Sequence, residues 1–265
     1  MNRLSKTFKN TAEKKEKALV GFVTAGDPTL DESKKIIKKM CESGVDILEL
    51  GVPFSDPTAD GPVIQRSSER ALKNKITLKT VLKMTAELRK ETEVPIILFS
   101  YYNPIFAFGP QRFYEKARAA GADGVLIVDL PPEESDELTG GWDDGEFSLI
   151  RLVAPTTPPE RIAEIAASAF GFLYLVSMTG VTGSGGLNTS LIADLVRKVR
   201  VYSDLPLCVG FGISTVDDVA NVAQVADGVV IGSAFERLIE ENIDKPDLAE
   251  RLAERTEEYK ESTKI

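Results

Sequence analysis

Eight short apolar runs, separated by polar and helical sequence, restrict the fold of this chain more than any other feature. They are rich in Val, Ile, Leu and aromatic residues and lie at 20–24, 45–50, 94–101, 123–128, 147–153, 171–177, 205–210 and 226–231. Strands that alternate with helices form parallel sheets with right-handed crossovers. Eight such units in 265 residues favour an α/β fold with one domain over 1–265, a (β/α)8 TIM barrel. A doubly wound sheet, in which the strand order reverses, stays compatible with the same pattern.

The sequence predicts more helices than the one that follows each strand in a regular (β/α)8 barrel. Residues 1–17 predict an extra N-terminal helix that covers the bottom of the barrel, and 63–91 is continuous helical sequence. Thr157 and Glu160 match a capping box at the start of another helix. The pattern therefore predicts a barrel with an N-terminal helix and short extra helices.

Two other helices differ in how clearly the sequence marks them. The stretch 189–200 has Leu191 and four further apolar residues at helical spacing, which predicts one buried face. The stretch 132–139 is a weaker helix because Gly140 and Gly141 follow it, and glycine disfavours helix.

Composition excludes several classes of function. The chain has no histidine, which rules out a Ser-His-Asp triad, a Cys-His pair and histidine-bound zinc. In an enzyme without a metal, carboxylates are then the leading candidates for proton transfer, with Lys, Tyr or Cys as alternatives. A net charge of −9 argues against nucleic acid or an anionic membrane as partner. The chain has only two cysteines, too few for a disulfide framework or a metal cluster. Its N-terminus is charged where a signal peptide would be apolar. We therefore expect a cytoplasmic protein.

The second apolar run ends in a carboxylate, and a loop rich in proline and glycine follows over 51–62. In an alternating strand Glu49 shares the inner face with Val45 and Ile47. An acid on the inner face at the carboxyl end of a barrel strand is placed where such enzymes keep catalytic groups. The alternative is a Glu49 that forms an ion pair with Arg or Lys.

A second carboxylate, Asp60, closes the same loop. Asp60 precedes Gly61 and Pro62, so the residues alone favour a cap on the helix that starts near Pro62. A catalytic role beside Glu49 is the other reading.

Three glycine-rich segments follow the last three strands, at 177–186, 210–214 and 231–236. Barrels often bind phosphate after strands seven and eight, on backbone N–H groups and a helix N-terminus. Ser233 would add a hydroxyl group. The segments at 210–214 and 231–236 therefore predict a phosphorylated ligand, while 177–186 predicts a mobile loop; tight turns and a plain connection are the alternatives.

Aromatic residues complete the candidate site. Alternation allows Phe22, Tyr101 and Tyr174 to point into the barrel near its carboxyl end, where they would suit a flat apolar substrate. Core filling is the alternative for each ring, and Tyr102 competes with Tyr101 for the inward position.

The residues from Glu49 to Gln65, ELGVPFSDPTADGPVIQ, resemble the signature of the tryptophan synthase α subunit family. The resemblance covers essentially the whole chain, and further matching segments lie at 22–28, 101–104, 129–131, 177–183, 210–212 and 232–233. One segment departs from the family, 138–145, where a regular amphipathic helix is expected.

The resemblance implies retro-aldol cleavage of indole-3-glycerol phosphate to indole and glyceraldehyde 3-phosphate, in the last steps of tryptophan biosynthesis. It assigns Glu49 as the general acid–base and Asp60 as the partner of the indole N–H. Phe22, Tyr101 and Tyr174 would line the indole pocket.

The resemblance also implies a phosphate site at Gly183, Gly212, Gly232 and Ser233, with Thr182 linking the mobile loop to the aspartate. No metal and no cofactor are expected in this chain. The family works as an α2β2 complex, so a β subunit carrying pyridoxal phosphate is the expected partner.

Three rival functions stay open. Indole-glycerol-phosphate synthase would need a lysine inside the barrel, and the strands offer none. A standalone indole-releasing lyase would be active without a partner. A non-catalytic regulatory barrel that binds phosphate is disfavoured by the presence of both Glu49 and Asp60.

Overall fold

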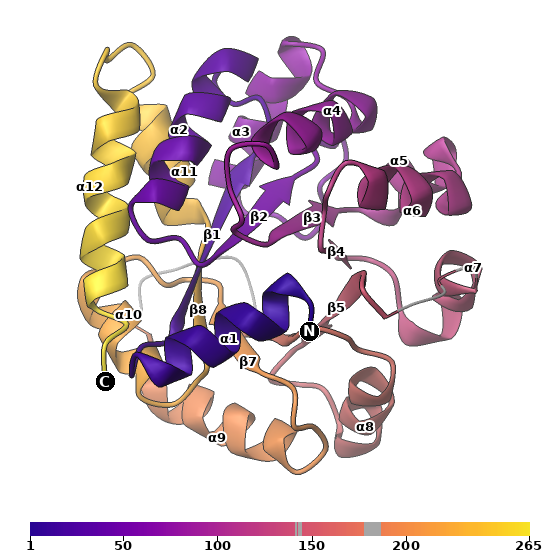
Figure 1. Ribbon diagram of the computed structural model, residues 1–265. Coiled ribbons are helices and arrows are strands. Elements are labelled where there is room, and N and C mark those ends of the chain that lie inside the picture. Colours follow the sequence, from indigo (N-terminus) through magenta and orange to yellow (C-terminus); the bar gives the residue numbers. More distant parts are fainter. Residues whose placement is uncertain (141, 143–144, 178–186) are drawn as a thin grey trace.

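A computed structural model describes residues 1–140, 142, 145–177 and 187–265 of this chain. Eight parallel strands pair in sequence order and close into a barrel, with β1 beside β8 (Figure 1). The strands are β1 Ala18–Thr24, β2 Ile47–Gly51, β3 Ile96–Ser100, β4 Gly124–Ile127, β5 Ser148–Val153, β6 Leu173–Val176, β7 Leu207–Gly210 and β8 Gly228–Ile231. The predicted (β/α)8 barrel is confirmed, and the doubly wound alternative is wrong because the strand order never reverses.

Helices surround the barrel and, at one end, close it. In the described residues they are α1 Arg3–Glu13, α2 Leu30–Glu42, α3 Pro62–Lys73, α4 Leu78–Leu88, α5 Tyr102–Phe108, α6 Pro110–Ala119, η1 Pro132–Glu134 (a 3-10 helix), α7 Asp136–Thr139, α8 Pro159–Ala167, α9 Thr189–Arg200, α10 Val216–Ala223, α11 Ser233–Glu241 and α12 Leu248–Glu261. The last helix, α12, packs along α2 in the outer layer of helices (Figure 1).

The N-terminal helix closes the amino end of the barrel, as the sequence predicted, although it ends at Glu13. In Figure 1 it lies across the strands. Leu4 is 1% exposed and packs with interior strand residues such as Ile47 and Ile97, and Phe8 joins the same cluster. Burial of an apolar side chain stabilises by about 1.5–3 kcal/mol, so α1 acts as an apolar plug.

The alternation of β2 fixes the direction of Glu49. Ile47 belongs to the interior cluster, while Leu48 and Leu50 pack outward against the helices. Val45 also packs outward, so its predicted inward position is wrong; it precedes the first residue of β2 and does not follow the strand alternation.

The predicted helix over 63–91 is wrong in one respect, because it is two helices. Between α3 and α4, Lys75 adopts a left-handed conformation with φ of 59°, which ends a right-handed helix. Ile76 is 3% exposed and anchors the connection, and Thr77 starts α4 by accepting a hydrogen bond from the Thr80 N–H.

Three smaller predictions differ from the structure. Thr157 does not cap α8; its hydroxyl accepts the Ala154 N–H instead, and Pro158 takes the cap position. The helix expected at 132–139 is divided into η1 and α7. Leu191 is 60% exposed and lies off the buried face of α9.

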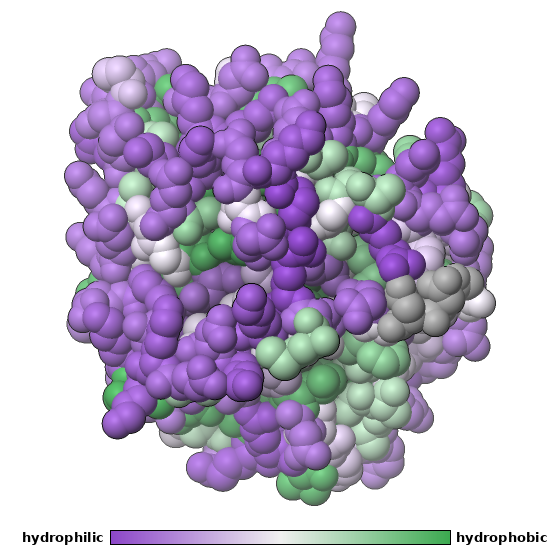
Figure 2. Space-filling model, viewed as in Figure 1, coloured by the Kyte–Doolittle hydropathy of each residue, from purple (hydrophilic) through white to green (hydrophobic). Residues whose placement is uncertain are grey.

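Hydrophilic side chains cover most of the face seen in Figure 2, and apolar ones occur in patches between them. Among the described residues, no helix is both long and apolar enough to cross a membrane.

Candidate active site

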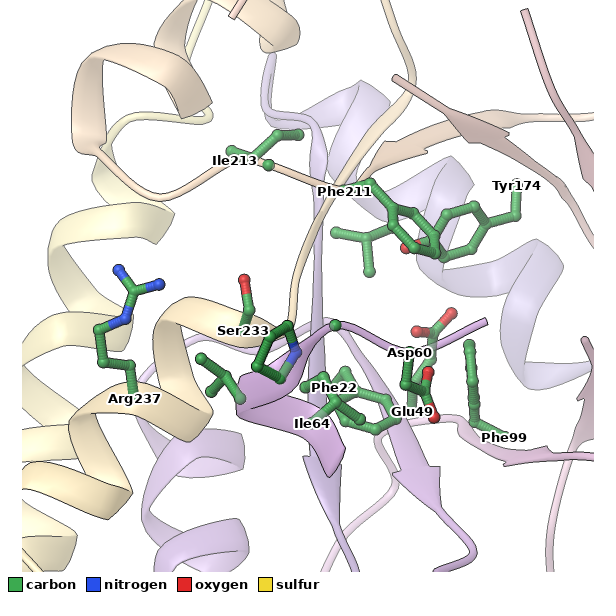
Figure 3. A pocket seen from close by; sticks show the side chains of 16 residues that line it. Phe22, Glu49, Asp60, Ile64, Phe99, Tyr174, Phe211, Ile213, Ser233 and Arg237 are labelled. Atoms are coloured by element: carbon green, nitrogen blue, oxygen red, sulfur yellow. The ribbon is translucent and has the colours of Figure 1, made fainter. Parts of the chain in front are cut away.

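A cavity at the carboxyl ends of the strands gathers most of the predicted site residues (Figure 3). Its lining includes two carboxyl groups, a set of apolar side chains, and a glycine-rich end beside α11. The predicted residues on it are Phe22, Glu49, Asp60, Tyr174, Gly212, Gly232 and Ser233. Thr182 and Gly183 lie outside the described residues.

Glu49 is an acid buried inside the barrel. It lies opposite Phe22 and Ile97 in the barrel ladder and is 1% exposed. Neither carboxyl oxygen has a hydrogen-bond partner within the part of the chain that the structure describes. The alternative prediction, an ion pair between Glu49 and an Arg or Lys, is therefore wrong. Burial in apolar surroundings raises the pKa of Glu49 to about 8, because the charged form loses its solvation.

Asp60 is the second carboxyl group and does not cap α3. The cap position belongs to Gly61, where no side chain bonds to the helix, so the capping prediction is wrong. Burial raises the pKa of Asp60 to about 6, although a hydrogen bond from the Tyr101 side chain opposes the shift. Near neutral pH the site thus combines an acid at Glu49 with a carboxylate at Asp60.

Tyr101 positions the Asp60 loop and does not line the cavity. Its side chain is 3% exposed, and its hydroxyl oxygen accepts the Ala59 N–H at 2.9 Å. The predicted place of Tyr101 in the pocket wall belongs to Phe99 on β3, whereas Tyr101 follows the strand and precedes α5. Phe99 meets Phe22 edge-on with ring centroids 5.1 Å apart. Strand alternation could have identified Phe99, because residues 97 and 99 share a face of the strand.

Tyr174 lines the cavity together with Glu49, and its ring requires a glycine at position 210. It is 4% exposed and meets Phe211 edge-on, with ring centroids 5.9 Å apart. A Cβ at Gly210 would lie 2.0 Å from the Tyr174 hydroxyl oxygen, so only glycine leaves room for this ring. Phe211 has φ of 73°, which turns the chain toward Gly212.

The far end of the cavity is suited to an anion. Ser233 is the first residue of α11, and Gly212 and Gly232 lie beside it on the cavity wall. Free N–H groups and the helix dipole favour negative charge at such a helix start. Arg237 lines the same cavity from the next turn of α11 (Figure 3), and no carboxylate pairs with it among the described residues. Arg237 was not among the predicted site residues, although its spacing of four from Ser233 on one helix was a usable signal.

The described side chains form no cluster of metal ligands. No group of three His, Cys, Asp or Glu able to hold a metal occurs in the described parts of the chain. Both cysteines are free thiols.

Comparisons with known proteins give the family. A family model described as "Tryptophan synthase alpha chain" matches residues 8–264. The tryptophan synthase alpha chain of Desulfosudis oleivorans is 70% identical over the full length of both chains, and that of Desulfatibacillum aliphaticivorans is 60% identical over the same share.

Solved structures agree. The tryptophan synthase subunit alpha from Legionella pneumophila is 40% identical with a TM-score of 0.92, covering 99% of this chain and 98% of that one. A chain of tryptophan synthase from Mycobacterium tuberculosis is 32% identical with a TM-score of 0.91, covering 100% of this chain and 99% of that one. The chain therefore belongs to the tryptophan synthase alpha chain family.

Proposed function

We propose that this chain cleaves indole-3-glycerol phosphate to indole and glyceraldehyde 3-phosphate, with Glu49 and Asp60 as its catalytic residues. The observation that carries the assignment is the pair of carboxyl groups in one apolar cavity with pKa values raised to about 8 and about 6. Between these values one group holds a proton while the other is charged, which acid–base catalysis requires.

The apolar wall supports a flat aromatic substrate between these groups. Phe22, Phe99 and Tyr174 line the cavity around Glu49. Their rings offer flat apolar contact area, with the Tyr174 hydroxyl as the one polar group on them. An indole ring held there would place its C3 atom near Glu49 and its N1–H near Asp60.

The cleavage then proceeds in two proton transfers. Neutral Glu49 protonates indole C3, and the Asp60 carboxylate stabilises the positive charge that develops at N1–H. The Glu49 carboxylate next removes the proton of the glycerol C3′ hydroxyl. The C3–C3′ bond breaks, its electron pair returns to the ring, and indole and the aldehyde form. Glu49 ends protonated as it began, so no external acid, metal or cofactor is needed.

The phosphate group would bind at the other end of the cavity. Gly212, Gly232 and Ser233 offer backbone N–H groups and a hydroxyl there. Gly183 and Thr182, outside the described residues, belong to this proposal through the family resemblance alone. Arg237 adds a cation without an acidic partner in the described chain.

Arg237→Gln is expected to raise KM for indole-3-glycerol phosphate about 3- to 10-fold and to leave kcat within 2-fold, because a charged contact to phosphate made equally in ground and transition states is lost. Steady-state kinetics at low and high salt check this. Arg237→Lys should stay close to the unchanged chain. Equal KM values for all three proteins would show that Arg237 does not contact the substrate.

A β subunit carrying pyridoxal phosphate is proposed as the partner, in an α2β2 complex that operates in the cytoplasm. The loop that bears Pro53 and Asp56 is the proposed contact with the β subunit. It follows the carboxyl end of β2, and Asp56 on it is exposed. The cofactor would belong to the partner, and indole would pass to it.

Indole release by the purified chain, measured with and without β subunit, tests the function. Slow release that rises when β is added supports the proposal. Equal turnover with and without β would identify a standalone lyase. No release in either case, with intact binding of glycerol 3-phosphate, would identify a non-catalytic phosphate-binding barrel.

A further inference from the structure

A second pair of buried acids lies just behind the proposed phosphate end, and the reaction does not use it. Glu236 lies on α11, one turn after Ser233, and is 0% exposed. Asp27 lies just after β1 and is 1% exposed. Buried carboxyl groups are costly unless each has a partner or holds a proton.

The hydrogen bonds divide unevenly between the two acids. Both oxygens of Asp27 accept from Arg70, from Nε and Nη2 at 2.7 Å each. Glu236 Oε1 accepts the Thr24 N–H at 2.6 Å. Glu236 Oε2 receives no donor from the described residues.

Among the described residues, the cations near Glu236 are hydrogen-bonded to other carboxylates. Arg70 also reaches Glu240 at 2.9 Å, and Arg66 binds both oxygens of Glu240 at 2.7 Å. Two guanidinium groups thus balance two carboxylates, Asp27 and Glu240. An ionised Glu236 would be a third, uncompensated negative charge in the protein interior.

A proton on Glu236 Oε2 would remove this imbalance, and the Asp27 carboxylate would be its acceptor. Burial raises the pKa of Glu236 well above its ordinary value, and the charge of Asp27 and the hydrogen bond to it raise the pKa further. The neutral acid also keeps negative charge away from the start of α11, where an anionic ligand would sit.

The same contacts join three elements that carry the proposed site. Thr24 ends β1, two residues after Phe22, and its hydroxyl lies 2.7 Å from the Ser67 hydroxyl of α3. Arg70 belongs to α3 as well, and α3 begins directly after the Asp60 loop. The network therefore links α11 to β1 and to the helix that follows Asp60.

We propose that Glu236, held by the Thr24 N–H and buried beside Asp27, is a positioning residue that fixes the first turn of α11 and so sets the geometry of the phosphate site at Ser233. This inference rests on the proposed phosphate site. It concerns a residue that touches neither substrate nor reacting atoms.

Glu236→Gln and Glu236→Leu separate this role from simple packing. Glutamine keeps an acceptor for Thr24 and an N–H donor for Asp27, whereas leucine keeps only volume. Binding of glycerol 3-phosphate and of indole is measured by calorimetry for each protein. We expect Glu236→Leu to bind glycerol 3-phosphate 5- to 20-fold more weakly with indole affinity unchanged, and Glu236→Gln to stay within 2-fold for both.

Thermal unfolding against pH gives a second readout. A raised pKa in the folded state makes the wild-type chain lose stability as pH rises from the unfolded value through the folded one. Glu236→Gln lacks that proton, so its Tm should exceed that of the wild type increasingly from pH 5 to 9. Glu241→Gln, the same change at an exposed position of α11, should alter neither Tm nor binding.

Three results would overturn the proposal: unchanged glycerol 3-phosphate affinity in Glu236→Leu, weakened affinity in Glu236→Gln, or equal pH dependence of Tm in Glu236→Gln and wild type. If Glu236→Leu does not fold, the glutamine variant alone decides by its affinity and Tm. Failure of the wild-type chain to bind glycerol 3-phosphate would instead refute the phosphate site itself, so the two failures are distinguishable.

Discussion

Replacing Glu49 by glutamine is expected to lower the rate of indole release about 10²–10⁴-fold. The amide has the shape of the neutral acid but cannot give a proton to indole C3 or take one from the hydroxyl. The measurement is kcat for indole-3-glycerol phosphate at pH 7.5, with KM expected within about 3-fold because the apolar wall is unchanged. Glu49→Asp should retain part of the rate, with an altered pH profile. A profile unchanged in Glu49→Asp would contradict the acid–base role.

The same Glu49→Gln change is expected to stabilise the fold. The pKa of Glu49 is raised to about 8 in the folded chain, so folded protein holds a proton that the unfolded chain releases above about pH 4.5. Wild-type stability therefore falls as pH rises from the unfolded pKa through the folded one. Glutamine removes this loss, on the order of 4 kcal/mol at pH 7.5. Urea unfolding measures the gain, and Glu69→Gln, an exposed counterpart on α3, should show none.

Replacing Asp60 by asparagine is expected to lower kcat/KM about 10²-fold and to remove the acidic limb of the pH profile. The wild-type rate should fall below about pH 6, where Asp60 is protonated, and above about pH 8, where Glu49 loses its proton. The asparagine side chain cannot titrate, so only the alkaline limb should remain in Asp60→Asn.

The pH series of kcat/KM for the wild type and Asp60→Asn checks this expectation. Asp31→Asn, at an exposed position of α2, is the matched control and should keep both limbs. An acidic limb that persists unchanged in Asp60→Asn would assign it to another group and contradict the role of Asp60.

The sequence could predict what depends on strand periodicity and on chain order. Glu49 and Phe22 obey the alternation of their strands, and two glycine-rich segments come directly after strands seven and eight. Because the carboxyl ends of all eight strands meet at one end of the barrel, these residues are brought together there. The predicted inward position of Val45 was wrong because Val45 lies before the first residue of β2. A period-two rule holds only within hydrogen-bonded strand.

What the sequence could not predict depends on packing around loops and helices. Tyr101 was expected in the pocket wall, but its hydroxyl holds the Asp60 loop, an interaction between segments that no local pattern reveals. The break at Lys75 arises from a left-handed residue that no glycine or proline marks. Glu236 and Arg237 are neighbours on α11, yet one is buried and the other exposed, a difference set by how the helix meets β1.

The protonation state of Glu49 at neutral pH is the most direct test of this account. The measurement is a ¹³C NMR titration of the chain with carboxyl-labelled glutamate, with Glu49→Gln used to assign the resonance. We expect a midpoint at about pH 8 for the signal that the variant lacks. A midpoint near 4.5, the ordinary value for glutamate, would mean that Glu49 is charged at neutral pH and would contradict its role as the acid that protonates indole.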